Sequence, residues 1–308
     1  MQWTSRLAAQ HSALWSFDRW YRLWWYIWPA SLALLIVGWI CVDKPGEVTS
    51  SSAARWGRPA PNAPPLPIRH SPILANWPEK LHNDVMTCFS NALDLTPLMQ
   101  ACTRLIDSGL APNPQLVAAY TQRGFLRRMK EPDLALTDFN TALNIEADAP
   151  VVLMNRAWIY ISRSRYDAAM QDLNKAIERF PPAAAGRARY YRGFTFFRMK
   201  DYPAAMSDLN EAVKVDPNNP DPYLTRGEIE QAEQQYDAAL RDYDEFSKRA
   251  PRNPRGLIGR GSVLEATGRA KEALLAYESA VALEPGNAQA LAARDRLRSQ
   301  QNSENQAK

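Results

Sequence analysis

Recurrent arginines are the first residues in this chain whose type and spacing could do chemistry. An arginine followed by Gly or Ala recurs at steps of 33, 36, 34 and 34 residues, at Arg123, Arg156, Arg192, Arg226 and Arg260. Such a row of guanidinium groups could bind an anionic ligand. Aspartates recur with nearly the same period, at Asp138, Asp172, Asp208 and Asp242. Because both signs repeat together, we favour ion pairs within the fold over an anion site.

The other reactive side chains do not form a catalytic or metal-binding set. The three histidines, His11, His70 and His82, lie far apart and lack the spacing of metal ligands. A nucleophile elbow, a phosphate-binding loop and a dinucleotide fingerprint are all missing from the sequence. We therefore predict that the protein is not an enzyme and that it uses no cofactor and no metal.

The arginines belong to an internal repeat. Each is followed by an alanine, then an aromatic residue or leucine, then in all but one unit another alanine, for example Ala205, Leu209 and Ala212. This spacing puts three residues on one face of a helix, and prolines such as Pro217 and Pro251 end that helix. The small residues after the arginines allow two helices to approach closely. The pattern resembles the tetratricopeptide repeat family over residues 117–287, as five units.

The resemblance implies an all-α fold, a right-handed superhelical solenoid of helix-turn-helix repeats. Residues 79–116 are predicted to be a degenerate first helix pair. After the five repeats of 117–287, we expect a capping helix at 288–299 and a disordered tail at 300–308.

Cys88 and Cys102 fall on the two helices of the degenerate pair. Facing residues of a helical hairpin satisfy the short separation that a disulfide needs. A bond is expected if this domain lies outside the cytoplasm. The alternative is two reduced, buried cysteines that act as small apolar residues.

Members of this family usually bind peptides along a concave face that the first helix of each repeat lines. The corresponding residues here are aromatic in repeats two and three and polar in repeats four and five. We predict a partner-binding groove formed by Phe125, Met154, Asn155, Trp158, Ile161, Arg187, Tyr190, Tyr191, Phe194 and Phe197. Rigid aromatic residues are favoured anchors at interfaces. Alternatively, several of these rings fill the space between helices.

The N-terminal part is predicted to reach a membrane. After a flank at residues 1–22, residues 23–42 contain twenty residues without a charge, enough to span about 30 Å of hydrocarbon. Trp and Tyr cluster at one end, as they do at headgroup depth. Residues 43–78 are rich in proline and serine and are interpreted as a linker. A signal peptide cleaved near Ala54 is the alternative.

The distribution of charge along the chain bears on the class of partner and on which side of the membrane the repeats lie. Residues 1–78 hold seven Lys or Arg and three acids, so the whole net charge of +4 belongs to them. The balanced remainder excludes a nucleic-acid binder. Arg19 and Arg22 directly precede the span and favour a cytoplasmic N-terminus.

The functional prediction combines these features. We expect a single-pass protein of the bacterial inner membrane with its repeats in the periplasm. It would act as an interaction scaffold or assembly factor that binds a protein or peptide through the groove. The alternative is a secreted periplasmic adaptor or chaperone.

Overall fold

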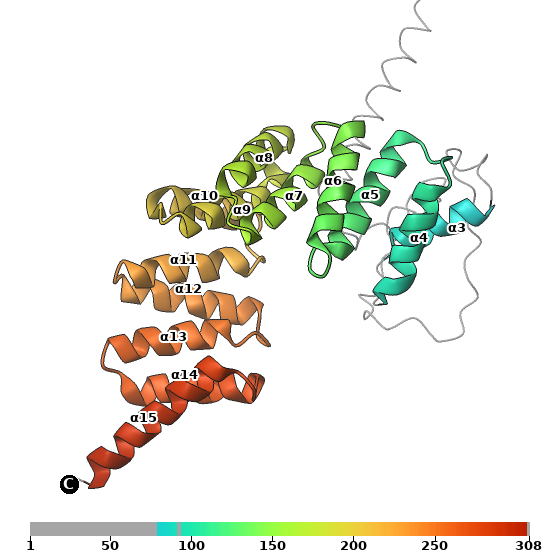
Figure 1. Cartoon of the computed structure of the whole chain (residues 1–308). Helices are drawn as coiled ribbons and strands as arrows, with labels where there is room; N and C mark the ends of the chain where they lie inside the picture. Colours follow the sequence, from blue (N-terminus) through green and yellow to red (C-terminus); the bar gives the residue numbers. More distant parts are fainter. Residues whose placement is uncertain (1–78, 91–93, 307–308) are drawn as a thin grey trace, which may run out of the picture. The chain divides into compact units, whose positions relative to one another are not determined.

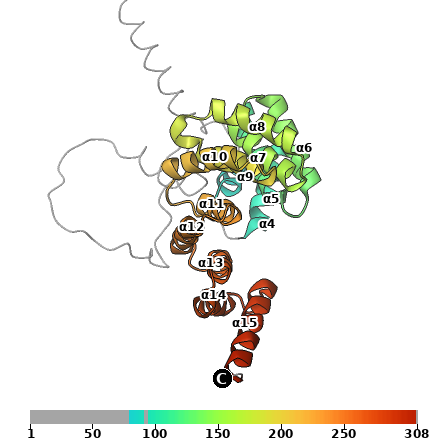
Figure 2. The same cartoon turned by 90° about the vertical axis from the view of Figure 1, so that its left-hand side faces the viewer.

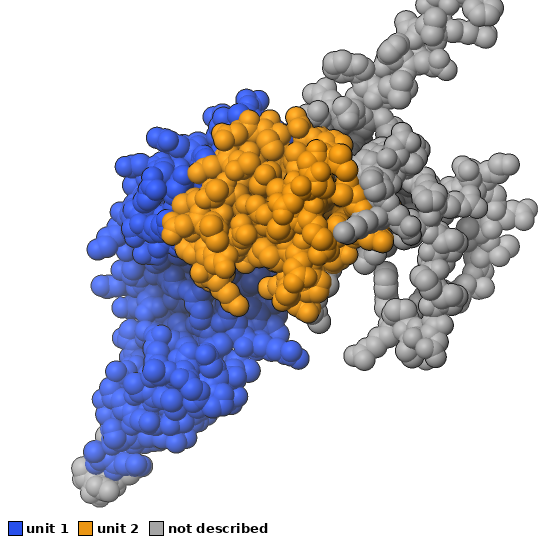
Figure 3. Space-filling view, turned by 45° about the vertical axis from the view of Figure 1, so that its right-hand side comes forward, with its two compact units in different colours: residues 1–27, 146–308 blue, residues 28–145 orange. Residues whose placement is uncertain are grey.

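The computed structural model describes residues 79–90 and 94–306, and these residues form two compact units. Unit 2 contains the described residues up to Ile145, and unit 1 contains those from Glu146 onward (Figure 3). The predicted flank, span and linker at residues 1–78 lie outside the described residues. Among the helices that are described, none is both long and apolar enough to cross a membrane.

Both units are built from antiparallel helix pairs, and the described residues contain no strand (Figure 1). In unit 2, α3 (Glu79–Cys88) pairs with α4 (Leu95–Asp107), and α5 (Asn113–Arg127) pairs with α6 (Pro132–Ile145). The all-α prediction is confirmed. One boundary differs, because α5 begins at Asn113, inside the range predicted for the degenerate pair, with Pro114 in its first turn.

Unit 1 continues the same pairing. Its helices are α7 (Pro150–Ser162), α8 (Tyr166–Arg179), α9 (Gly186–Arg198), α10 (Tyr202–Val215), α11 (Asp221–Ala232), α12 (Tyr236–Arg249), α13 (Arg255–Ala266), α14 (Ala270–Leu283) and α15 (Ala288–Gln306). The first helices of successive repeats lie side by side, α7 with α9, α9 with α11 and α11 with α13. Figure 2 views α12, α13 and α14 nearly along their axes, which shows how the helices stack.

The close approach of paired helices depends on the predicted small residues. A methyl group added to Gly227 in α11 would lie 3.0 Å from a ring carbon of Tyr243 in α12. Tyr243 is 1% exposed and packs with Ala239, Phe246 and Leu224. The alanine and aromatic positions of the repeat therefore face the core, as the period predicted.

Two segments differ from a simple repeat. The extra residues before repeat three form a short 3-10 helix, η1 (Pro182–Ala184), which lies against α9 and α10. At the other end, α15 packs on repeat five through Ala290, Ala293 and Leu297. It continues to Gln306, although we predicted a cap ending at 299 and a disordered tail. Residues 299–306 contain neither Gly nor Pro, so nothing in the sequence ends the helix.

Candidate functional site

The recurrent arginines are used inside the fold. Arg192 in α9 donates to both carboxylate oxygens of Asp208 in α10, at 2.6 and 2.8 Å. The same pairing joins Arg123 to Asp138, Arg156 to Asp172 and Arg226 to Asp242. All four aspartates are buried. The interpretation as ion pairs is therefore confirmed, and these arginines do not form a row of cations for an anionic ligand.

Several of these arginines also hold the preceding repeat. Arg192 donates to Asn174 of α8, and Arg226 donates to Asn210 of α10, both at 2.8 Å. Arg260 follows a variant of the pattern, because its helix partner carries Ala276 where the other repeats carry aspartate. Its guanidinium lies 3.2 Å from Asp244 of the preceding repeat instead.

The residues predicted for the groove divide by burial. Met154, Asn155, Ile161 and Tyr190 are buried in unit 1, and the Asn155 amide donates to the Val151 carbonyl of its own helix. Ile161 is only 1% exposed. These four side chains fill the space between helices, which is the alternative that the sequence left open for them.

The remaining aromatic residues of repeats two and three form one continuous cluster. The ring centroids of Trp158 in α7 and Tyr191 in α9 are 5.1 Å apart, and Phe194 lies 6.3 Å from Trp158. Phe197 extends the row at 6.1 Å from Phe194. All four rings are half-buried. We call Trp158, Tyr191, Phe194 and Phe197 the aromatic surface, and it spans two neighbouring repeats.

The other two residues predicted for the groove, Phe125 and Arg187, are not part of the aromatic surface. Phe125 belongs to unit 2, where it is 39% exposed and the Arg128 guanidinium stacks on its ring at 3.9 Å. Arg187 is exposed at the start of α9. The prediction missed Tyr202, whose ring stacks on Phe197 at 6.2 Å. A tyrosine at the start of the second helix in repeats two, three and four was the signal for it.

The next repeat places an ionic cluster beside the aromatic surface. Burial raises the pKa of Asp221 and of Glu228, while the cation of Arg255 opposes the shift at both. Arg255 donates to Glu228 at 3.1 Å, and Arg187 also lowers the pKa of Asp221. The pKa of Tyr190 is raised mainly by burial and, to a smaller extent, by the Asp221 carboxylate. Two acids therefore face two cations, and their charges balance.

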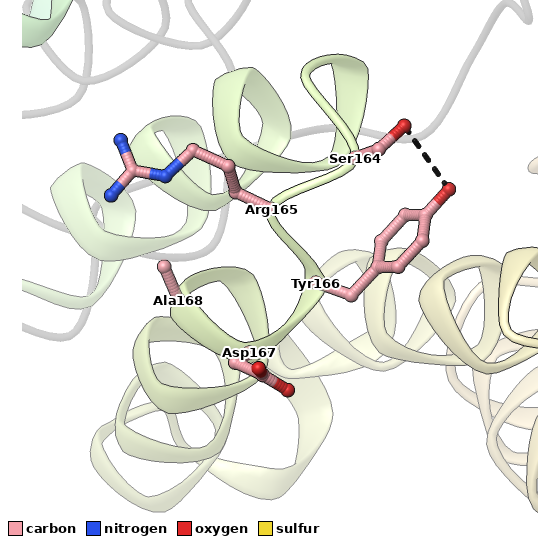
Figure 4. Close-up of a pocket in the computed structure, with 5 residues that line it drawn as sticks. All are labelled: Ser164, Arg165, Tyr166, Asp167 and Ala168. Carbon is pink, nitrogen blue, oxygen red and sulfur yellow. Dashed lines mark hydrogen bonds between the residues drawn. The ribbon is translucent and has the colours of Figure 1, made fainter.

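A hollow in the described part of the chain lies at the turn between α7 and α8. A hollow of about 300 Å³ is lined by Ser164, Arg165, Tyr166, Asp167 and Ala168, five consecutive residues around the α7–α8 turn (Figure 4). The Tyr166 hydroxyl donates to Ser164 at 3.4 Å, and the other side chains do not converge on it. Across the described part of the chain, no three His, Cys, Asp or Glu side chains group as metal ligands do.

Cys88 and Cys102 lie on facing helices of unit 2. The structure joins them by a disulfide with their Cα atoms 4.8 Å apart, and both residues are fully buried. They pack with Leu105, Ala101 and Ala119. The bond fastens α3, the first described helix, to α4.

Comparisons with known proteins agree with this architecture. The model of the tetratricopeptide repeat family matches residues 154–220 and 223–288. Tetratricopeptide repeat protein 13 of Homo sapiens is 29% identical over 136 residues, which are 42% of this chain and 16% of that protein. The chain thus spans about a sixth of the length of this curated relative.

Two solved structures show the same fold. The pilF protein of Pseudomonas aeruginosa is 18% identical with a TM-score of 0.59, covering 72% of this chain and 98% of that chain. PilW, described as a widely conserved type IV pilus biogenesis factor, is 17% identical with a TM-score of 0.60, covering 70% of this chain and 98% of its own. At these identities the likeness concerns the fold.

Proposed function

We propose that this chain, an all-helical array of tetratricopeptide repeats, is a membrane-anchored scaffold or assembly factor that binds a protein or peptide through its aromatic surface. The observation that carries the proposal is the continuous cluster of half-buried rings from Trp158 to Phe197, which crosses two repeats. Tryptophan and tyrosine dominate the energetics of interfaces. The recurrent arginines and aspartates are paired inside the fold, so the proposal rests on the rings rather than on a row of cations.

The membrane anchor rests on the sequence. Residues 23–42 have the length, the lack of charge and the aromatic flank of a single span. A position in the bacterial inner membrane with periplasmic repeats is supported by Arg19 and Arg22 before the span. The Cys88–Cys102 pairing also fits an oxidising compartment. The cleaved, secreted form predicts a mature protein that starts near Arg55, so intact-mass measurement separates the two forms.

Affinity capture tests the binding role. The full chain and a Trp158→Ala/Phe194→Ala variant are used to recover proteins from a detergent-solubilised envelope fraction. We expect recovery of specific partners to fall at least tenfold in the variant, since each lost anchor costs about 2 kcal/mol. A Tyr166→Ala variant, altered at the α7–α8 turn, is the matched control. Equal recovery from all three proteins, with cooperative unfolding retained, would remove the aromatic surface from the account.

A further inference from the structure

Repeat four, which consists of α11 and α12, holds a buried acid at a position where the other four repeats hold none. Glu230 lies one helical turn after Arg226 in α11 and is only 8% exposed. The same position in the other repeats is a cation, an aromatic residue or an aliphatic residue: Arg127, Tyr160, Phe196 and Leu264. Burial disfavours the charged form of a carboxyl group. An acid at this place therefore needs a separate explanation.

The second helix of the repeat presents another carboxylate to Glu230. In unit 2, the Arg127 guanidinium at this position donates to the buried Asp138 at 2.9 Å. The corresponding aspartate of repeat four is Asp242, which therefore meets a carboxyl group instead of a cation. Both Asp242 oxygens accept hydrogen bonds from Arg226, at 2.8 and 2.5 Å. The Oε2 atom of Glu230 is buried and has no hydrogen-bond partner among the described residues.

The groups around Glu230 favour its protonated form. Burial and then Asp242 of α12 raise the pKa of Glu230 to about 7, although Arg226 and Arg241 oppose the shift. Tyr243 of α12 stays neutral, because burial and nearby acids, including Glu230, raise its pKa as well. The recurrent charged side chains of α9, α10 and α13 are paired with other groups: Arg192 with Asp208, and Arg260 with Asp244.

Glu230 also lies at the junction between repeats three and four. Its neighbour Ile229 is fully buried in the core of repeat three, where it packs with Tyr190 and Leu209. The helix α11 thus contacts α12 within its own repeat and both α9 and α10 of the repeat before it. A charge on Glu230 weakens the contact with α12, because two buried carboxylates repel each other. Opening of α11 uncovers the core of repeat three at the same time.

We propose that Glu230 makes this junction sensitive to protons, so that α11 is held closed while the carboxyl group is protonated and opens locally more often once the proton leaves. Because the folded-state pKa is raised, the stabilisation is complete below the ordinary pKa of glutamate and is lost as pH rises through about 7. The released proton goes to solvent, and no other group changes. The device is independent of the proposed binding role.

Hydrogen exchange of the full chain in detergent tests this device, since it reports the local opening of each helix. Exchange is read by mass spectrometry at about pH 4.5 and about pH 8, and each rate is divided by the intrinsic rate at that pH. We expect the protection of α11 and α12 to fall at least about tenfold at the higher pH, and that of α14 in repeat five to change less than about twofold. No fall in α11 and α12, or an equal fall in α14, overturns the proposal.

Two substitutions at Glu230 separate the proton from a merely structural role. Glu230→Gln cannot titrate, and Glu230→Leu installs the residue type that repeat five carries as Leu264. Both variants should show the same protection of α11 and α12 at the two pH values. Glu233→Gln changes an exposed acid at the end of the same helix and is the matched control, so it should keep the fall. A fall that persists in both Glu230 variants, or is lost in the control, assigns the titration to another group and overturns the proposal.

Discussion

At the scale of single residues, the recurrent arginine and aspartate side chains explain how a neutral array can contain so many charges. Asp172, Asp208 and Asp242 each accept two hydrogen bonds from the guanidinium of their own repeat, as Asp172 does from Arg156. Asp138 accepts from both Arg123 and Arg127. Arg192 and Arg226 use a remaining N–H group on the repeat before them. These hydrogen bonds link the two helices of a repeat and, for Arg192 and Arg226, the neighbouring repeat as well.

The buried ion pairs give the first prediction. Asp208→Asn keeps the shape of the side chain but leaves the Arg192 guanidinium without its charge partner in a largely buried place. Removing one member of a buried pair costs about 3 kcal/mol. We expect that loss in the free energy of unfolding from urea denaturation. Asp148→Asn is the control, since Asp148 pairs with Lys175 and Arg179 at the exposed surface, and it should have no measurable effect. Equal losses in both variants would contradict this role.

Glu230 gives a prediction about pH. Its Oε2 atom is buried without a hydrogen-bond partner, and the Asp242 carboxylate lies next to it. Burial and then Asp242 raise the pKa of Glu230 from 4.5 to about 7, although Arg226 opposes the shift. The same repeat position in unit 2 is Arg127, which donates to Asp138 at 2.9 Å. At this repeat position, Arg127 therefore attracts its aspartate, whereas Glu230 repels Asp242.

Because the folded-state pKa is raised, the proton of Glu230 stabilises the fold at low pH. Stability is lost as pH rises from about 4.5 to about 7, because over this range the unfolded chain releases that proton while the folded chain retains it. Glu230→Gln mimics the protonated form. We expect it to be more stable than the unaltered chain by about 1 to 2 kcal/mol at pH 8 and nearly equal at pH 4.5. A difference that does not depend on pH would refute the assignment.

At the scale of helices and turns, the same backbone position has a positive φ in four successive repeats. The turn between the two helices of a repeat holds Ser164, Lys200, Gln234 and Gly268 at φ values of 56°, 66°, 61° and 74°. This left-handed conformation costs a residue with a Cβ atom about 1 kcal/mol. Only the last of the four turns has the residue type that adopts it without cost.

The turns therefore make a matched pair of substitutions. Gln234→Gly should raise the free energy of unfolding by up to about 1 kcal/mol, and Gly268→Ala should lower it by a similar amount. An added methyl group at Gly268 meets no atom within 4 Å, so its effect isolates the backbone conformation. Urea denaturation measures both. A stability change of the same sign in the two variants would rule out this explanation.

The first described helix pair, α3 and α4, gives the fourth prediction. The disulfide joins α3 to α4 across a sequence separation of 14 residues, and such a loop contributes about 3 kcal/mol. We expect Cys88→Ser/Cys102→Ser to lower the stability of unit 2 by about that amount. A reductant should destabilise the unaltered chain but not the variant. An effect of reductant on both proteins would place the sensitive group elsewhere.

Much of the fold could be predicted because its determinants are local. The alanine and aromatic spacing specified the core faces, and the equal period of Arg and Asp indicated the ion pairs. The exposure of individual rings could not be predicted in this way. Tyr190 and Tyr191 are neighbours of one type, yet burial between α9 and α11 hides the first and leaves the second half-exposed. That difference depends on how a helix is rotated against the next repeat.

At the scale of the whole molecule, the proposed function assigns separate tasks to two parts of the chain. Residues 23–42 would hold the chain at a membrane, and the repeats would present the aromatic surface. The likeness to a pilus biogenesis factor concerns the fold.

The most direct test of the central claim is the affinity of the captured partner for the aromatic surface. Isothermal titration compares the full chain with Trp158→Ala/Phe194→Ala and with the control Tyr166→Ala, after urea denaturation has shown that all three are folded. Loss of two ring anchors predicts a dissociation constant at least about 100-fold weaker in the double variant and unchanged in the control. An equal dissociation constant for all three proteins would contradict the claim that the aromatic surface binds the partner.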